Sequence, residues 1–489
     1  MPRKNLALEV ALVVLALLGA FIVQAVISQT KPPRMPELGG QEKGGGEEQT
    51  VVASETLVVE NSEDQNHAIP AAFSKHLSSL GTIPDWSVLD NYQYTVTKSD
   101  FVRLMTDVYS VGDYWKEWFK VEDDHVMVRM SAEDETKEYK LSFMNEVVEA
   151  KAKRYWRAKK EIEIPEGTKP LLGVRIAIDP GHIGGDFASV EQRRFVLNEA
   201  TPPIQEGNMT LIVAEQLVDQ LEMLGAQVTL VRSSNQPVNP FRPEDYYAYA
   251  KSKLQVFKSA VTEASVKREA QKLFYRNGEI RERARIINEQ IRPDIVLCLH
   301  FNADPQPDPL NPILIENEHF HMILNGAYTK SEMAHDDERF KCLLKVVQGN
   351  HEEEAKLAAA AAKSLAEATG LAAYQYAPNS SRAVNVAGNP YLWGRNLIAN
   401  RLFDCPVLYY EPYLMNGKDS FERMQVGDYE GLRFINGKLR FSIYREYVQA
   451  VTRGLVDYYS AAEKAEVPAE AEDDSALSLE EESDMLGIK

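Results

Sequence analysis

Two histidines and two glutamates have the side-chain types of a hydrolytic metal site: His182, His300, Glu206 and Glu411. Imidazole nitrogens and carboxylate oxygens are common ligands of zinc, and a catalytic zinc is usually held by three protein side chains with one position left open. A second carboxylate near such a metal can act as the general base of a hydrolysis. These residue types point to metal-assisted hydrolysis, provided that the fold brings them together.

Each of the four residues stands beside a predicted secondary-structure element. Glu206 comes just before a helix that is predicted to begin at Asn208. Three short apolar core strands lead to the others: strand 174–178 reaches His182 after a short turn, strand 295–299 ends at His300, and strand 406–410 ends at Glu411. Because the carboxyl ends of neighbouring strands in an α/β sheet share one edge, we expect the side chains to converge there.

The first histidine lies in a glycine-rich turn, within the stretch AIDPGHIGGD at 177–186. Gly181, Gly184 and Gly185 allow the backbone to turn tightly, so that a rigid strand can hold His182 toward an ion. Asp179 either orients a ligand from behind or starts the turn.

Other interpretations apply to single residues. A lone histidine at a strand end is more often a structural residue, and a glutamate before a helix is more often a cap, so only the combination favours a metal site. Cys298 could act as a nucleophile with His300, but it stands in an apolar run that disfavours a thiolate. His319 and His321 alternate onto one face of a predicted strand, where they either contact substrate or metal or form an ordinary polar face.

Strands alternate with helices from about 173 to 465, which predicts an α/β domain with a mixed sheet flanked by helices. Besides the three core strands, the pattern predicts a helix at 208–224, a strand at 227–231, a charged helical stretch at 243–275, and helices at 280–291, 353–369 and 439–465.

The chain before this domain divides into three parts. Residues 1–28 contain a long apolar run preceded by Arg3 and Lys4, which predicts a transmembrane anchor or a cleaved signal segment, with the rest of the chain exported. Residues 29–71 have the composition of a flexible linker. Residues 72–162 predict a small α+β module of unknown role, with a helix at 98–109 and strands near 125–130 and 139–143.

After the domain, an acidic tail at 466–489 is expected to be disordered.

The overall composition excludes some classes of protein. The 489 residues include 54 basic and 73 acidic side chains, with a net charge of -19 and a pI near 5.1. Such a chain repels a phosphate backbone at long range, so a nucleic-acid partner is not expected. Three cysteines, Cys298, Cys342 and Cys405, form no disulfide framework and no cysteine-based zinc motif.

Four motifs follow one another along the chain: IAIDPGH at 176–182, EGN at 206–208 opening a helix, LHFNA at 299–303, and PVLYYE at 406–411 with Leu414 and Asn416. In this order they resemble the motifs of zinc-dependent N-acetylmuramoyl-L-alanine amidases of the Amidase_3 type. The resemblance implies that His182, Glu206 and His300 bind Zn²⁺ and that Glu411 is the catalytic glutamate. The stretch RARIIN at 283–288 also resembles a helix of that family and is expected to be structural.

The chain departs from the family pattern in several places. Gly207 replaces a basic residue after the second ligand, Cys298 replaces a serine, and Phe301 replaces a small residue, which would narrow the cleft or alter substrate preference. Two segments look inserted. The helical stretch 241–276 is expected to be functional or separately structured. The acidic stretch 335–354 either occludes the metal or presents a solvated helix face.

The resemblance implies hydrolysis of the amide between N-acetylmuramic acid and L-alanine in peptidoglycan, for cell-wall remodelling or cell separation. It also implies peptidoglycan as substrate and an activator protein as a possible partner. The alternative is a catalytically inactive peptidoglycan-binding or scaffolding protein, which would lack one of the four site residues. The N-terminal segment predicts a place in the cell envelope, either anchored to the cytoplasmic membrane and facing the periplasm or secreted into it.

Overall fold

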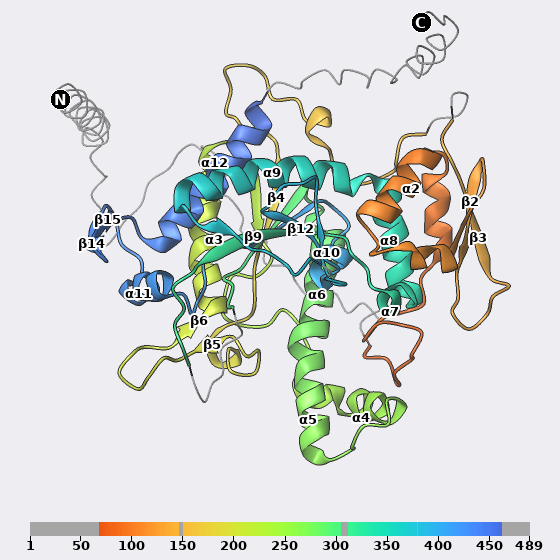
Figure 1. Cartoon of the computed structure of the whole chain (residues 1–489), viewed down its shortest axis with the longest axis horizontal. Helices are drawn as coiled ribbons and strands as arrows, with labels where there is room; N and C mark the ends of the chain where they lie inside the picture. The colour runs from red at the N-terminus through yellow and green to blue at the C-terminus, as the bar shows by residue number, and fades with distance from the viewer. Residues whose placement is uncertain (1–67, 146–149, 305–311, 379, 462–489) are drawn as a thin grey trace, which may run out of the picture. The chain divides into compact units, whose positions relative to one another are not determined.

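The computed structural model describes residues 68–145, 150–304, 312–378 and 380–461, all within one compact unit that spans 66–489 (Figure 1). The predicted N-terminal segment 1–28, nearly all of the linker 29–71 and the acidic tail 466–489 lie outside these residues. None of the described helices combines the length and the apolar composition that crossing a membrane requires.

The centre of the unit is a mixed sheet in which β11, β12, β9, β13, β8, β4 and β7 lie side by side in that order, with β10 also paired to β9. The pairs β4–β7, β4–β8 and β13–β8 are parallel, whereas β13 and β9 are antiparallel. The strands are β4 (Arg175–Pro180), β7 (Gln227–Leu230), β8 (Ile295–Leu299), β9 (His319–Leu324), β10 (Ala372–Ala373), β11 (Val384–Asn385), β12 (Leu392–Gly394) and β13 (Val407–Glu411). The predicted mixed sheet is thus confirmed.

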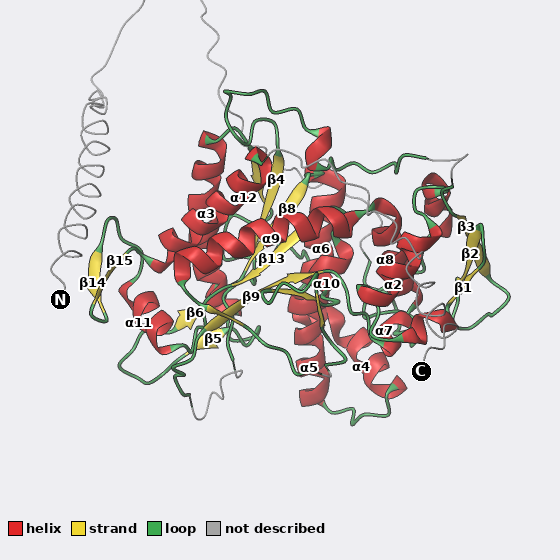
Figure 2. Ribbon diagram, turned by 45° about the horizontal axis from the view of Figure 1, so that its top comes forward, coloured by secondary structure: helices red, strands yellow, loops and turns green. Residues whose placement is uncertain are grey.

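Helices cover both faces of this sheet (Figure 2). The described helices of the unit are α2 (Lys98–Asp107), α3 (Glu206–Met223), α4 (Tyr247–Val256), α5 (Glu263–Lys272), α6 (Glu279–Arg285), α7 (Lys330–Met333), α8 (Asp336–Gln348), α9 (Asn350–Thr369), α10 (Ile398–Leu402), α11 (Lys418–Val426) and α12 (Ile443–Ser460). Two segments of π-helix, η6 (Leu273–Gly278) and η7 (Ile286–Ile291), flank α6.

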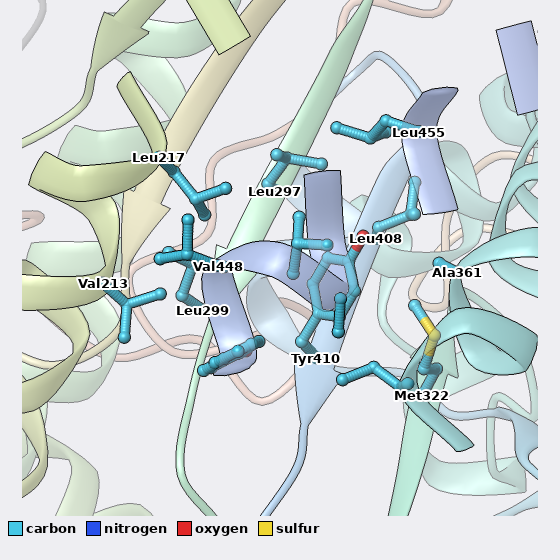
Figure 3. Packing of buried hydrophobic residues seen from close by; sticks show 14 of the residues in the cluster. Val213, Leu217, Leu297, Leu299, Met322, Ala361, Leu408, Tyr410, Val448 and Leu455 are labelled. Atoms are coloured by element: carbon cyan, nitrogen blue, oxygen red, sulfur yellow. The ribbon is translucent and has the colours of Figure 1, made fainter. Parts of the chain in front are cut away.

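Alternation along the strands decides which helices cover which face, because successive side chains point to opposite sides of a sheet. Leu297, Leu299, Leu408 and Tyr410 point to one side, where they pack against α3, α9 and α12 (Figure 3). The intervening residues of the same strands point to the other side. There, buried side chains of β4, β8 and β13 pack against α6, η7 and α10: Ala177, Val296, Cys298, Val407, Ala284, Ile287, Ala399 and Leu402.

The N-terminal module shares its core with the main fold. It contains α2 and the antiparallel strands β1 (Phe119–Val121), β2 (His125–Arg129) and β3 (Glu138–Ser142). Its buried aromatic residues belong to one cluster with Tyr328, Phe340 and Leu343, which lie before and within α8. Ten residues of α8 are buried. The expectation that 335–354 presents a solvated helix face is therefore wrong, because this segment is the surface on which the module packs.

The inserted stretch 241–276 is well structured. It forms α4 and α5, which pack against each other, and α5 continues through η6 into α6 (Figure 1). Tyr246, Tyr249 and Phe274 from this insertion are buried together with Ile183, the residue after the first predicted ligand. The insertion is thus packed directly behind the turn that carries His182.

Some predicted boundaries need correction. The helix expected from Asn208 begins at Glu206. The helix expected to begin at 439 begins at Ile443, because the residues before it form a hairpin of β14 (Arg433–Ile435) and β15 (Lys438–Arg440). Its turn is Asn436-Gly437, both with positive φ, a pair that is typical of tight hairpins. A further small pair, β5 (Arg194–Phe195) and β6 (Ile204–Gln205), precedes α3.

Candidate metal centre

Three of the four predicted site residues meet at the carboxyl edge of the central sheet. Candidate ligand atoms of His182, Glu206 and His300 all lie within 4.8 Å of one another. The Glu206 carboxylate stands between the two imidazoles, with Oε1 3.0 Å from Nδ1 of His300 and Oε2 3.3 Å from Nε2 of His182. Glu206 and His300 are buried, and His182 is partly exposed, so the group opens to solvent on the side of His182.

His182 is held in an unusual backbone conformation, with φ of +60°, which is uncommon for a residue that has a side chain. Glu191 supports this turn. Its carboxylate accepts hydrogen bonds from the backbone N–H of Ile183 and Gly184 at 2.9–3.1 Å and lies 3.4 Å from Nδ1 of His182. Glu191 therefore fixes both the loop and the orientation of the imidazole. Sequence reasoning missed it, since nothing in the surrounding SVEQRR stretch marks it.

Two buried arginines bind the carbonyl groups of the same turn. Arg283 donates to Asp179 Oδ1 at 2.7 Å and to the carbonyl oxygens of Pro180 and His182 at 2.8 Å. Arg232 donates to the carbonyls of Pro180, Gly181 and Gly207. Asp179 thus acts on the site through Arg283, which fits the interpretation that it orients a ligand from behind.

Close backbone packing brings the second and third residues to the first. A Cβ atom added to Gly181 would lie 2.3 Å from the ring of His300, and one added to Gly207 would lie 2.3 Å from the backbone nitrogen of Gly184. A basic side chain like the one that the family usually carries after its second ligand would therefore have no room at position 207. On its other side, the His300 ring stacks on Tyr409 with centroids 4.3 Å apart and an interplanar angle of 12°.

Arg193, and not a residue at position 207, brings a cation to the site. Arg193, just before β5, brings its Nε to 3.1 Å from Glu206 Oε2 and 3.2 Å from His182 Nε2. Its guanidinium thus lies against the face that two of the three candidate ligands share. Sequence reasoning missed Arg193 because it lies outside the motifs. The β5–β6 pair brings it to the start of α3, where its carbonyl accepts a hydrogen bond from the Glu206 N–H.

Glu411 lies on the same side of the sheet as Tyr409, two residues before it on β13. Across the ladder it pairs with His321 of β9. Burial and the neighbouring Glu206 carboxylate raise the pKa of Glu411 well above its ordinary value, while Arg193 and Arg395 oppose this rise. The two glutamates are therefore close enough to influence each other, as a ligand and a base of one site would be.

The pKa values of the Glu206 and Glu411 carboxylates are shifted in opposite directions. Burial alone would raise the pKa of Glu206, but the neighbouring His182, the hydrogen bond from His300 and the charge of Arg193 reverse this and lower it. Burial lowers the pKa of His300, with Glu206 opposing, which favours the neutral imidazole that binds metals. Without a metal, the protein thus keeps Glu206 ionised and Glu411 prone to protonation.

The donor set fits a divalent metal ion. Two imidazoles and one carboxylate converge within the span of one coordination sphere, and this is a common ligand set of catalytic zinc. The side that Arg193 contacts already accommodates a positive charge. No further residue has to move into the group to complete a set of three ligands.

The remaining predicted residues lie nearby or in the core. Cys298 is fully buried, and burial raises the pKa of its thiol far above the ordinary value, so it is no nucleophile. Phe301 is also buried, against Tyr413 and Tyr447, so it does not narrow an open cleft as expected. Nε2 of His321 forms a hydrogen bond with the hydroxyl of Tyr376, 3.2 Å away. Its buried Nδ1 has no hydrogen-bond partner within the described part of the chain.

Residues 176–425 match the sequence family described as Amidase_3: N-acetylmuramoyl-L-alanine amidase, which is about half of the chain. The chain belongs to this family. The resemblance predicted from the four motifs is thereby confirmed, and the amidase is an enzyme of the peptidoglycan-cleaving class. No curated protein sequence matches it significantly.

Solved structures similar to the amidase include the apo form of the N-acetylmuramyl-L-alanine amidase Ami1 from Mycobacterium abscessus, with 17% identity, 59% of this chain and 100% of the other covered, and a TM-score of 0.32. The CwlD amidase from Clostridioides difficile in complex with the GerS lipoprotein has 14% identity, coverage of 58% and 98%, and a TM-score of 0.33. The amidase AmiC2 of Nostoc punctiforme has 13% identity, coverage of 60% and 98%, and a TM-score of 0.30.

The arginine beneath the His182 turn gives a prediction about stability. Replacing Arg283 with Ala leaves Asp179 and Glu279 buried without their counter-charge, so we expect a loss of about 3–5 kcal/mol in the free energy of unfolding. Arg285→Ala, which removes a partly exposed pair with Glu282, should cost about 0–1 kcal/mol. Urea unfolding of both variants measures the difference, and equal losses would show that Arg283 does not support the turn.

Proposed function

We propose that the amidase uses zinc to hydrolyse the amide bond between N-acetylmuramic acid and L-alanine in peptidoglycan, in cell-wall remodelling or cell separation. The observation that carries this proposal is the convergence of His182, Glu206 and His300 beside Glu411. The family match supports the bond type, and the donor set supports the metal. The alternative, an inactive wall-binding protein, predicts that at least one of these four residues is missing. All four are present in this chain.

In the proposed site, His182, Glu206 and His300 are the zinc ligands. A zinc ion bound there would supply Lewis acidity, which polarises an amide carbonyl and lowers the pKa of a water molecule toward about 7. The protein's contribution is to hold the three ligands in place. Glu191 fixes His182 at Nδ1, and Tyr409 and Gly181 fix the plane of the His300 ring.

Glu411 is the proposed general base. It takes a proton from the attacking water and returns it to the leaving nitrogen of L-alanine, which requires a carboxyl group that exchanges protons near neutral pH. Its raised pKa, caused first by burial and then by Glu206, suits this role. Its position at the end of β13, next to Tyr409, keeps it rigid.

Arg193 is the proposed electrostatic partner of the substrate. For His182 Nε2 to bind the metal, the guanidinium has to give up its contact with that nitrogen. It then remains at the edge of the site, where a cation stabilises the negative charge that develops on the amide oxygen.

The place of the enzyme in the cell is also proposed from the sequence. Arg3 and Lys4 before the apolar run of 1–28 favour export of everything that follows, whether the segment is retained as an anchor or cleaved. Peptidoglycan outside the cytoplasmic membrane is then within reach. An activator protein stays a prediction.

A reporter enzyme that is active only outside the cytoplasm, fused after residue 70, tests this localisation. We expect the fusion to be active, because the positive residues keep the N-terminus inside. The same fusion made with a reporter that is active only in the cytoplasm should be inactive. Activity of that second fusion, with none from the first, would contradict the proposed localisation.

Two glutamine variants separate the base from the ligand. Glu411→Gln is nearly isosteric but cannot accept a proton, so it should keep its fold and its zinc and lose on the order of 10²-fold or more in turnover. Glu206→Gln should instead bind zinc more weakly, because a ligand is removed. The measurements are zinc content and digestion of purified peptidoglycan, with mass spectrometry of the new termini.

The termini identify the bond. The proposal expects peptides that begin with free L-alanine and glycan strands that keep intact N-acetylmuramic acid. Glu199→Gln, an exposed glutamate before β6, serves as the control and should leave both readouts unchanged. If the Glu411 variant lost its zinc while the Glu206 variant kept it, the two roles would be exchanged, and full activity in both would refute the mechanism.

A further inference from the structure

A cavity of about 620 Å³ lies between the turn before β5 and the inserted helices. Val190 and Gln192, on the turn that leads into β5, form one side of it, and residues of α4, α5 and η6 with the α4–α5 loop form the other. The residue after Gln192 is Arg193, whose guanidinium contacts His182 and Glu206. The lining of the cavity is therefore one residue along the chain from a side chain that contacts two of the candidate ligands.

The electrostatic surroundings of Tyr275, in the wall of the cavity, also connect the cavity with Arg193. Burial raises the pKa of the Tyr275 hydroxyl, and the cations of Arg276 and Arg193 oppose this rise. Tyr275 is thus close enough to Arg193, which contacts the proposed ligands, and to Arg276, in the wall of the cavity, for both cations to act on its hydroxyl.

The inserted helices are basic in an otherwise acidic protein. Residues 251–276 contain seven lysines and arginines and two glutamates, whereas the whole chain has a net charge of -19. One of the glutamates, Glu269, is paired with Lys253 at 2.6 Å. A local excess of positive charge attracts anions even when the net charge of the protein is negative.

Three cations of this segment line the cavity: Arg268, Lys272 and Arg276. No ion pair joins any of them to an acidic side chain within the described residues. Burial lowers the pKa of Lys272, Glu269 opposes this, and the cations of Lys253 and Arg276 lower it further. The cavity thus presents crowded positive charges that an anion would relieve.

The wall that carries these cations is fixed to the site. Phe274 and Leu273 of η6 are buried in one cluster with Ile183, the neighbour of His182. The ring of Phe274 lies 5.8 Å from that of Phe187, in the loop after His182. The basic wall and the first ligand are therefore held by a common core, as a substrate subsite requires.

The occupant has to be anionic and attached to the molecule whose amide is cleaved. In a muramoyl peptide the lactyl carboxyl group is used in the scissile amide, so the free carboxylates lie along the peptide. We propose that Arg268, Lys272 and Arg276 bind the carboxylates of the substrate's peptide and make the enzyme selective for acidic peptides. This rests on the proposed function, since it takes the muramoyl peptide as substrate.

Binding to the full chain carrying Glu411→Gln tests the subsite without turnover. The two probes are an N-acetylmuramoyl peptide with free carboxylates and the same compound with those carboxylates converted to amides, compared by calorimetry. We expect the free acid to bind roughly tenfold or more tightly than the amide. Arg268→Gln, Lys272→Gln and Arg276→Gln should each reduce this preference, and the triple variant should abolish it.

Lys251→Gln and Lys267→Gln are the matched controls, because these exposed lysines stand on the same helices and do not line the cavity. They should keep the preference for the free acid. Equal losses in controls and cavity variants, or a preference that the triple variant retains, would overturn the proposal. A DNA oligonucleotide serves as a third probe. If the triple variant lost affinity for this oligonucleotide and kept its preference for the free acid, the occupant would be a phosphate polymer and the proposal would be overturned.

The subsite and the proposed function fail separately. If the protein prefers the free acid but releases no peptide from peptidoglycan, the subsite stands and the amidase mechanism fails. If it hydrolyses peptidoglycan and binds both probes equally, the mechanism stands and the subsite is overturned.

Discussion

The structure depends on keeping one carboxylate charged where it is almost completely buried. Glu206 begins α3 at the edge of the sheet, and an unpaired charge at such a position would be strongly unfavourable. His182, His300 and Arg193 surround it and supply the compensation. The rest of the site follows from this requirement, because each of the three has to be delivered from a different element: a strand turn, a strand end and a small hairpin.

The elements that look additional to an α/β enzyme serve this arrangement. The insertion that forms α4, α5 and η6 packs its aromatic side chains against Ile183 and so supports the turn of His182. The segment around α8 buries one face against the N-terminal module, so that the module is part of the same folded unit. Both insertions therefore have packing roles that are independent of any regulation.

The sequence predicted the parts of this molecule that depend on local pattern. Short apolar runs ending in His300 and Glu411 are strands because their side chains are buried on both faces, and parallel pairing then brings their ends together. Glu191, Arg193 and Tyr409 could not be found in the same way. Glu191 and Arg193 act through contacts that an irregular loop and a small hairpin create, and Tyr409 acts through stacking across neighbouring strands, and no spacing rule encodes such contacts. The solvated face expected for 335–354 was wrong for a similar reason, since charged residues of α8 are compensated within the fold: Arg339 by Asp336, and Glu338 by Arg401.

The central claim is that His182, Glu206 and His300 together bind one zinc ion while Glu411 stays free to move protons. X-ray diffraction from crystals of the zinc-loaded enzyme, measured on both sides of the zinc absorption edge, tests it most directly. The account predicts one anomalous peak per chain, bonded to the two imidazoles and to the Glu206 carboxylate, with the Arg193 guanidinium turned away from His182 Nε2. A peak bonded to Glu411 in place of Glu206, or no peak while Arg193 keeps its contacts, would contradict it.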